Sequence, residues 1–62
     1  SEQLIKVGFD RWQAMTVKEL FDNRPDIRDA CINGDMVAIT WLASMTGFRR
    51  SWLVERFKAW EA

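Results

Sequence analysis

The sequence predicts an all-α fold, a small bundle of three to five short helices within one domain of residues 1–62. Apolar residues recur at intervals of three and four over most of the chain, which is typical of amphipathic helices. Residues typical of helix starts and ends separate these segments. The one segment with strand-like alternation lies near the amino end. We therefore expect residues 1–15 to form an extended or strand-like arm and residues 16–62 to form the helical core.

The amino-terminal segment carries two patterns. Ile5, Val7 and Phe9 alternate with polar residues or glycine, which is a strand pattern. Ile5, Phe9 and Trp12 also stand at helical spacing, and only Gly8 speaks against a helix. A strand here would find no partner elsewhere in the chain. The segment is therefore expected to be an arm, free or paired across a dimer.

The first helix is expected to begin at Thr16. Thr16 and Glu19 have the spacing of a capping box, in which each side chain satisfies a backbone N–H at the helix start. Met15 and Leu20 are placed as the accompanying hydrophobic staple. The apolar face of this helix is made of Val17, Leu20 and Phe21.

A second short helix follows the Arg24-Pro25 pair. The residue before proline is disfavoured in the α region, so the first helix ends there, and proline suits the first turn of the next. Asn33-Gly34 ends this second helix. Its apolar stripe is Ile27, Ala30 and Cys31. The acidic residues around it are interpreted as helix-start acids and solvated surface rather than a catalytic pair or metal site: Asp22, Asp26 and Asp29.

Two further helices complete the predicted bundle. Asp35 can cap the third, which runs to about Met45, and its core-facing stripe is Ala38, Trp41, Leu42 and Met45. Gly47 supplies the corner after it, because glycine adopts positive φ without a Cβ penalty. The final helix spans about residues 49–60. Its buried line is Leu53, Phe57 and Trp60, and the opposite face is Ser51, Glu55 and Lys58.

Composition excludes several classes of function. The chain has one cysteine and no histidine, so zinc and haem sites of the usual kind and imidazole-dependent triads are not expected. Cys31 is interpreted as a small buried hydrophobe. No phosphate-binding glycine loop or nucleophile–base pair is visible. We expect a protein that is not an enzyme and that binds no cofactor and no metal.

Charge is balanced overall but uneven along the chain. Nine basic and nine acidic residues cancel, which argues against coating nucleic acid by charge alone. Residues 1–46 hold five basic and seven acidic side chains, whereas residues 47–62 hold four and two. A local basic face is therefore expected after Gly47. Without an apolar run of about 18 residues or a signal-peptide pattern, no membrane partner and a cytoplasmic location are predicted.

The corner at Gly47 resembles the helix-turn-helix of small bacterial and phage DNA-binding proteins. That pattern has an apolar then a small residue in the first helix, glycine in the turn, and apolar residues after it. The matching residues are Leu42, Ala43, Gly47, Phe48 and Leu53, within residues 39–58. Thr46 and Arg56 depart from it, because they stand where the pattern prefers apolar residues.

The resemblance implies a transcriptional regulator or phage or plasmid accessory factor that inserts the helix beginning near Arg49 into the major groove of double-stranded DNA. The side chains that it places at the DNA are Arg49, Arg50, Ser51, Glu55 and Lys58. Those on the flank of the helix are candidates for an interface: Trp52, Arg56 and Ala59. Because the chain is small, a homodimer is also expected.

The alternative function is a helical protein-interaction module without a nucleic-acid role. Short helices with Ile32-Asn33-Gly34 in mid-chain are similar to sterile alpha motif domains, although the distance from this tripeptide to Gly47 is about two residues short for them. Eight large aromatic residues could also supply anchors for a protein partner or a homodimeric adaptor.

Overall fold

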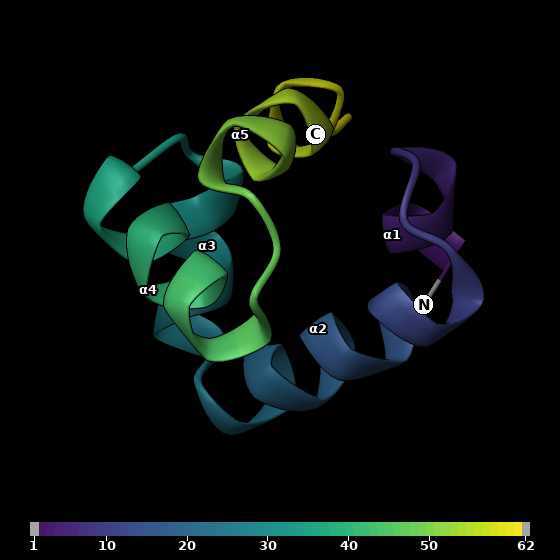
Figure 1. Cartoon of the computed structure of the whole chain (residues 1–62), viewed down its shortest axis with the longest axis horizontal. Helices are drawn as coiled ribbons and strands as arrows, with labels where there is room; N and C mark the ends of the chain where they lie inside the picture. The colour runs from purple at the N-terminus through teal and green to yellow at the C-terminus, as the bar shows by residue number, and fades with distance from the viewer. Residues whose placement is uncertain (1, 62) are drawn as a thin grey trace.

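The computed structural model describes residues 2–61, which form five helices and no strand. The helices are α1 (Glu2–Lys6), α2 (Arg11–Asn23), α3 (Pro25–Ile32), α4 (Met36–Thr46) and α5 (Arg50–Lys58). Figure 1 shows α2 along one side of the bundle, α3 and α4 at one end of it, and α5 on the side opposite α2. The prediction of a small all-α bundle is confirmed.

The prediction of an extended arm is wrong for the described part of residues 1–15; Ser1 lies outside it. Residues 2–6 form α1, and α2 already includes residues 11–15. The physical reason is burial, because Leu4, Val7 and Phe9 are each no more than 6% exposed. The helical core therefore includes this segment and does not begin at residue 16.

The predicted helix start at Thr16 is also wrong. Asp10 caps α2 by accepting a hydrogen bond from the Gln13 backbone N–H at 2.8 Å, and the Gln13 side chain accepts one from the Asp10 N–H at 2.9 Å. This capping box starts the helix before Thr16. The Thr16 hydroxyl instead donates to the Trp12 carbonyl at 3.0 Å. Met15 is 55% exposed, so the predicted staple does not form.

The other local signals act as predicted. Pro25 occupies the first turn of α3, and Gly34, at φ +83°, follows the end of that helix. The Asp35 carboxylate caps α4 by accepting from the Val37 N–H at 2.9 Å. Gly47 ends α4 in the left-handed region at φ +79°. The boundaries of α3 and α4 thus follow from single residues.

The core collects apolar side chains from all five helices and the α1–α2 loop. Phe57 of α5 lies within it, with its ring centroid 6.0 Å from that of Phe9 and 6.1 Å from that of Phe21. The buried residues are Leu4, Val7, Phe9, Ala14, Val17, Phe21, Cys31, Ala38, Ile39, Leu42, Leu53 and Phe57. In α4 the buried stripe includes Ile39, whereas Met45, predicted to be in it, is exposed. Helix α5 ends at Lys58, and Trp60 packs partly buried beyond it.

Gly8 joins α1 to α2 at φ +114°, a conformation that residues with a Cβ rarely adopt. A Cβ here would also lie 2.6 Å from Nη1 of Arg56. We expect Gly8→Ala to lower the free energy of unfolding by about 1–3 kcal/mol, measured by urea denaturation. Gly34→Ala is the control, because Gly34 also has positive φ but has open space around it. A loss no larger at Gly8 than at Gly34 would contradict the close approach of Arg56.

Candidate nucleic-acid interface

The turn between α4 and α5 is held by hydrogen bonds made by Gly47 and Thr46. The Gly47 N–H donates to the Ala43 carbonyl at 2.8 Å. The Thr46 hydroxyl donates to the Leu42 carbonyl at 2.8 Å and accepts from the Phe48 N–H at 3.2 Å. Thr46 thus closes the turn with its hydroxyl, which accounts for a polar residue where the helix-turn-helix pattern prefers an apolar one.

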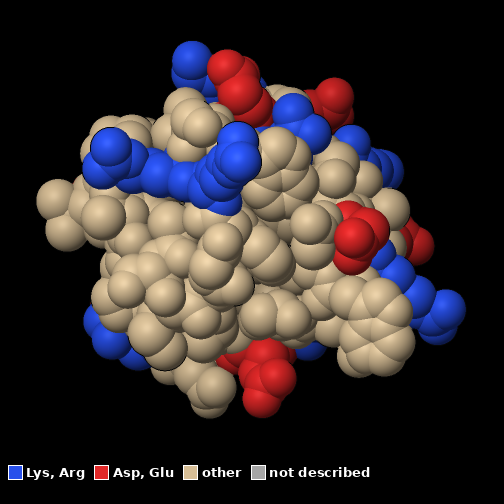
Figure 2. Space-filling view, in the orientation of Figure 1, with Lys and Arg blue, Asp and Glu red and all other residues tan. Residues whose placement is uncertain are grey.

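The beginning of α5 presents two arginines to solvent. Arg49 is the N-cap residue, Arg50 is the first helical residue, and Ser51 follows; all three side chains are exposed. No ion pair within residues 2–61 involves either arginine. Figure 2 shows basic side chains gathered over this end of α5, with a broad uncharged surface directly below them. The local basic face expected from the sequence is therefore present at this end of α5.

The remaining candidate residues of α5 divide into two groups. Glu55 and Lys58 are exposed and continue the solvent-facing line of Ser51. Trp52 is half-buried: its ring meets that of Phe9 edge-on at 5.1 Å and that of Phe48 at 5.8 Å. Most of the Trp52 ring is therefore engaged within the chain. Ala59 is exposed and is the C-cap residue of α5.

The Arg56 side chain extends from α5 to the loop that precedes α2. Its guanidinium carbon is 5.4 Å from the centroid of the Trp52 ring, and its side chain packs against the Gly8 backbone. The Nε atom is buried and has no hydrogen-bond partner within the described residues. The long aliphatic stem and the stacked guanidinium cover apolar surface, as an apolar side chain at this position would.

Three of the four acidic residues of α2 and α3 are paired with bases close to them in sequence, and Glu19 is the exception. Lys18 Nζ lies 2.6 Å from Asp22 Oδ2, Arg24 pairs with Asp26 at 2.9 Å, and Arg28 pairs with Asp29 at 3.0 Å. The hydrogen bond from Arg24 lowers the pKa of Asp26. These exposed pairs fit the interpretation of the acids as solvated surface.

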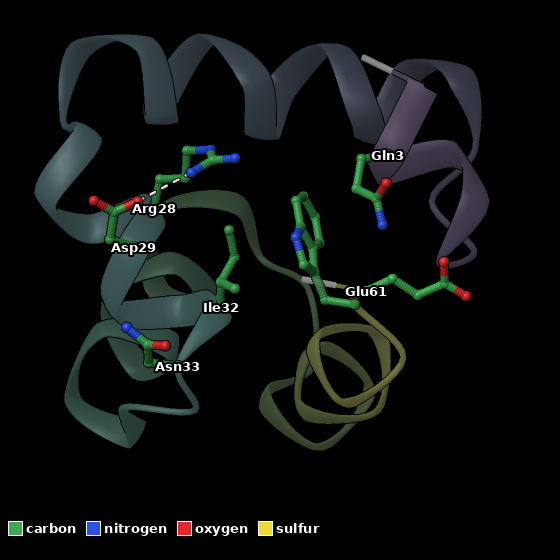
Figure 3. A pocket seen from close by; sticks show the side chains of 7 residues that line it. Gln3, Arg28, Asp29, Ile32, Asn33 and Glu61 are labelled. Atoms are coloured by element: carbon green, nitrogen blue, oxygen red, sulfur yellow. Dashed lines mark hydrogen bonds and ion pairs between the residues drawn. The ribbon is translucent and has the colours of Figure 1, made fainter.

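An open hollow lies between α3 and the carboxyl end of α5 (Figure 3). Gln3 and Glu61 approach it from one side, and Arg28, Asp29 and Ile32 from the other. The Arg28 guanidinium is paired with Asp29 and lies 5.8 Å from the centroid of the Trp60 ring. Its lining contains the carboxylates Asp29 and Glu61 and no serine, threonine, cysteine or lysine that could act as a nucleophile.

Cys31 is fully buried, as the sequence predicts for a small hydrophobe. Burial is the larger cause that raises the pKa of its thiol from 9.0 to about 11, and the negative charge of Asp35 adds to it. A thiol in this state is a poor nucleophile at neutral pH. Within residues 2–61, no three Cys, Asp or Glu side chains gather closely enough to hold a metal ion.

The surface residue that the sequence analysis missed is Trp12, which is 76% exposed on α2. The signal for its helix was present in the Asp10-x-x-Gln13 spacing, a variant of the capping box with aspartate and glutamine. Met15 lies one turn further along on the same side of α2 and is also exposed. Together they form an apolar patch that no candidate site had included.

No family model, curated protein or solved structure shows significant similarity to the chain. None of the helices that the structure describes has the length and hydropathy needed to cross a membrane.

The raised pKa of Cys31 predicts how stability depends on pH. The unfolded chain loses the thiol proton near pH 9.0, whereas the folded chain keeps it until about pH 11. The stabilisation is therefore complete below pH 9 and is lost as the pH rises towards 11. We expect the urea midpoint to fall over this range in the parent and to fall less in Cys31→Ala. An equal decline in both proteins would contradict a buried, protonated thiol.

Proposed function

We propose that this domain binds double-stranded DNA in a sequence-dependent manner through the beginning of α5. The observation that carries the proposal is the pair Arg49 and Arg50, exposed at the start of a helix that follows a glycine turn and without an acidic partner in residues 2–61. In a helix-turn-helix, the second helix enters the major groove with its amino-terminal residues at the base edges. Helix α5 follows α4 and the glycine turn, so in the proposed complex it would be this second helix.

The start of α5 differs from those of α2 and α4. Asp10 and Asp35 supply carboxylates that cap those two helices, whereas no side chain caps α5. The first backbone N–H groups of a helix favour an anion, and a DNA phosphate would provide the missing acceptor. The Ser51 hydroxyl can contribute to the same phosphate contact.

The types of side chain on this helix can supply both affinity and discrimination. An arginine can hydrogen-bond O6 and N7 of guanine together, and a carboxylate such as that of Glu55 can accept from the cytosine amino group. The exposed Lys58, in the last turn of α5, would contact the phosphate backbone further along. Because the chain has no net charge, affinity is expected to depend on these few contacts and not on a general attraction to DNA.

The test is a fluorescence-anisotropy titration with a pool of labelled duplexes at 50 and 200 mM salt. With two or three phosphate contacts, we expect affinity to fall about ten- to fortyfold between these concentrations. Replacing a base-reading arginine by Arg49→Ala or Arg50→Ala should cost about 1–3 kcal/mol of binding free energy and relax the preference among duplexes.

The matched control is Lys18→Ala, which removes one positive charge at a different place. Lys18 lines a hollow with Leu4 and Trp60, next to the opposite end of α5. Its loss should change the dissociation constant less than twofold. No binding at 50 mM salt, or equal losses in Lys18→Ala and the arginine variants, would reject the proposal and leave the interaction module as the remaining hypothesis.

A further inference from the structure

Trp12 differs from the other three tryptophans in having no aromatic or cationic partner within residues 2–61. The guanidinium of Arg24 stacks over the Trp41 ring, and that of Arg28 stacks over the Trp60 ring. The Trp52 ring packs against two phenylalanines. Trp12 is 76% exposed on α2, so its ring contributes little to the packing of the core. A ring of this size removes roughly 150–250 Å² from water when it is covered.

The surface around Trp12 forms a stripe on the outer side of α2. Ala14, Val17 and Phe21 face the core, so helical geometry places Trp12 and Glu19 on the opposite side, with Met15 and Thr16 between them. The Thr16 hydroxyl already donates to the Trp12 carbonyl, so it adds little polarity. This stripe consists of Arg11, Trp12, Met15 and Glu19, and we call it the α2 outer face.

Two charges of opposite sign stand at the ends of the α2 outer face. Arg11 and Glu19 are exposed, and neither takes part in an ion pair among the described residues. Their neighbours Lys18 and Asp22, in contrast, are paired with each other. The face therefore has a basic end, an apolar middle and an acidic end. Such an order is complementary to itself when two copies lie antiparallel.

We propose that two copies of this chain associate through the α2 outer face, with the two α2 helices antiparallel about a two-fold axis at Met15. In this register Arg11 of each copy lies opposite Glu19 of the other, as an isologous contact requires. Trp12 packs beside the facing Met15, and its indole N–H can donate to the facing Glu19 carboxylate. The pairing goes beyond the proposed DNA contact and does not use Arg49 or Arg50.

The size of this surface limits the area that the dimer can bury. Specific interfaces bury about 1,200–2,000 Å² in total, and weak ones less. One copy exposes 4272 Å², so even the lower figure needs about a seventh of each surface. A contact made by one face of one helix lies at the small end of this range. We expect a dissociation constant on the order of 10–500 µM.

Sedimentation equilibrium of the 62-residue chain, at protein concentrations from about 10 µM to 1 mM, tests the pairing. The parent should pass from monomer to dimer over this range, and Trp12→Ala should raise the dissociation constant at least tenfold. Val37→Ala is the control, because Val37 is 81% exposed but lies on α4. Circular dichroism of each variant verifies that it remains helical.

Charge reversal tests the antiparallel register. Arg11→Glu and Glu19→Arg should each weaken the dimer, because each places like charges opposite one another, and the double variant should restore association to within about threefold of the parent. A monomer up to 1 mM would overturn the pairing and leave this face to a different protein. A dimer that tolerates Trp12→Ala, loses equal strength in Val37→Ala, or is not restored by the double reversal would also overturn it. Arg49→Ala should leave the dimer unchanged, so this result is separate from the DNA titration.

Discussion

The position of α5 depends on the packing of Phe57 against Phe9 and Phe21. These three rings join the last helix to α2 and to the loop that precedes it, with centroids about 6 Å apart. Leu53, one turn earlier, is completely buried. Removing a large core side chain costs about 3–5 kcal/mol, which is comparable to the whole stability expected for a domain of this size. The aromatic contact therefore holds both the fold and the direction of α5.

The charge at the beginning of α5 follows from how the acids are used elsewhere. Each ion pair in residues 2–61 joins residues no more than four apart, within α2, within α3 or at the start of α3. Two further acids, Asp10 and Asp35, are occupied as helix caps. These five acids are engaged away from α5, and Arg49 and Arg50 take part in no ion pair among residues 2–61. A chain with no net charge can therefore present a basic helix start.

Sequence patterns predicted the later helices well, because their boundaries depend on single residues with one strong preference. Pro25 at a helix start, Asp35 as a cap and Gly47 at positive φ are such residues. The first fifteen residues could not be assigned in this way. Their short apolar runs fit both helix and strand, and burial of Leu4, Val7 and Phe9 against α2 and α5 decides between them. Tertiary packing is not visible in local spacing.

Part of the candidate site could also be predicted from the local sequence. Exposure of Ser51, Glu55 and Lys58 followed from placing Leu53 in the core, since helical geometry then fixes the outer face. The roles of Thr46 and Arg56 did not follow. Their hydrogen bonds and stacking involve the turn and the Gly8 loop, whose course only the structure shows. The exposed Trp12 was missed because its segment was not expected to be helical.

The most direct test of the central claim is the set of backbone amide chemical shifts of the ¹⁵N-labelled chain, recorded with and without a short DNA duplex. If the beginning of α5 contacts DNA, the largest changes should fall at Arg49, Arg50 and Ser51, with smaller ones near Glu55. The amides of α1 and of the middle of α2 should move little. Largest changes on α2, or an unchanged spectrum at a duplex concentration above that of the protein, would contradict DNA contact through the beginning of α5.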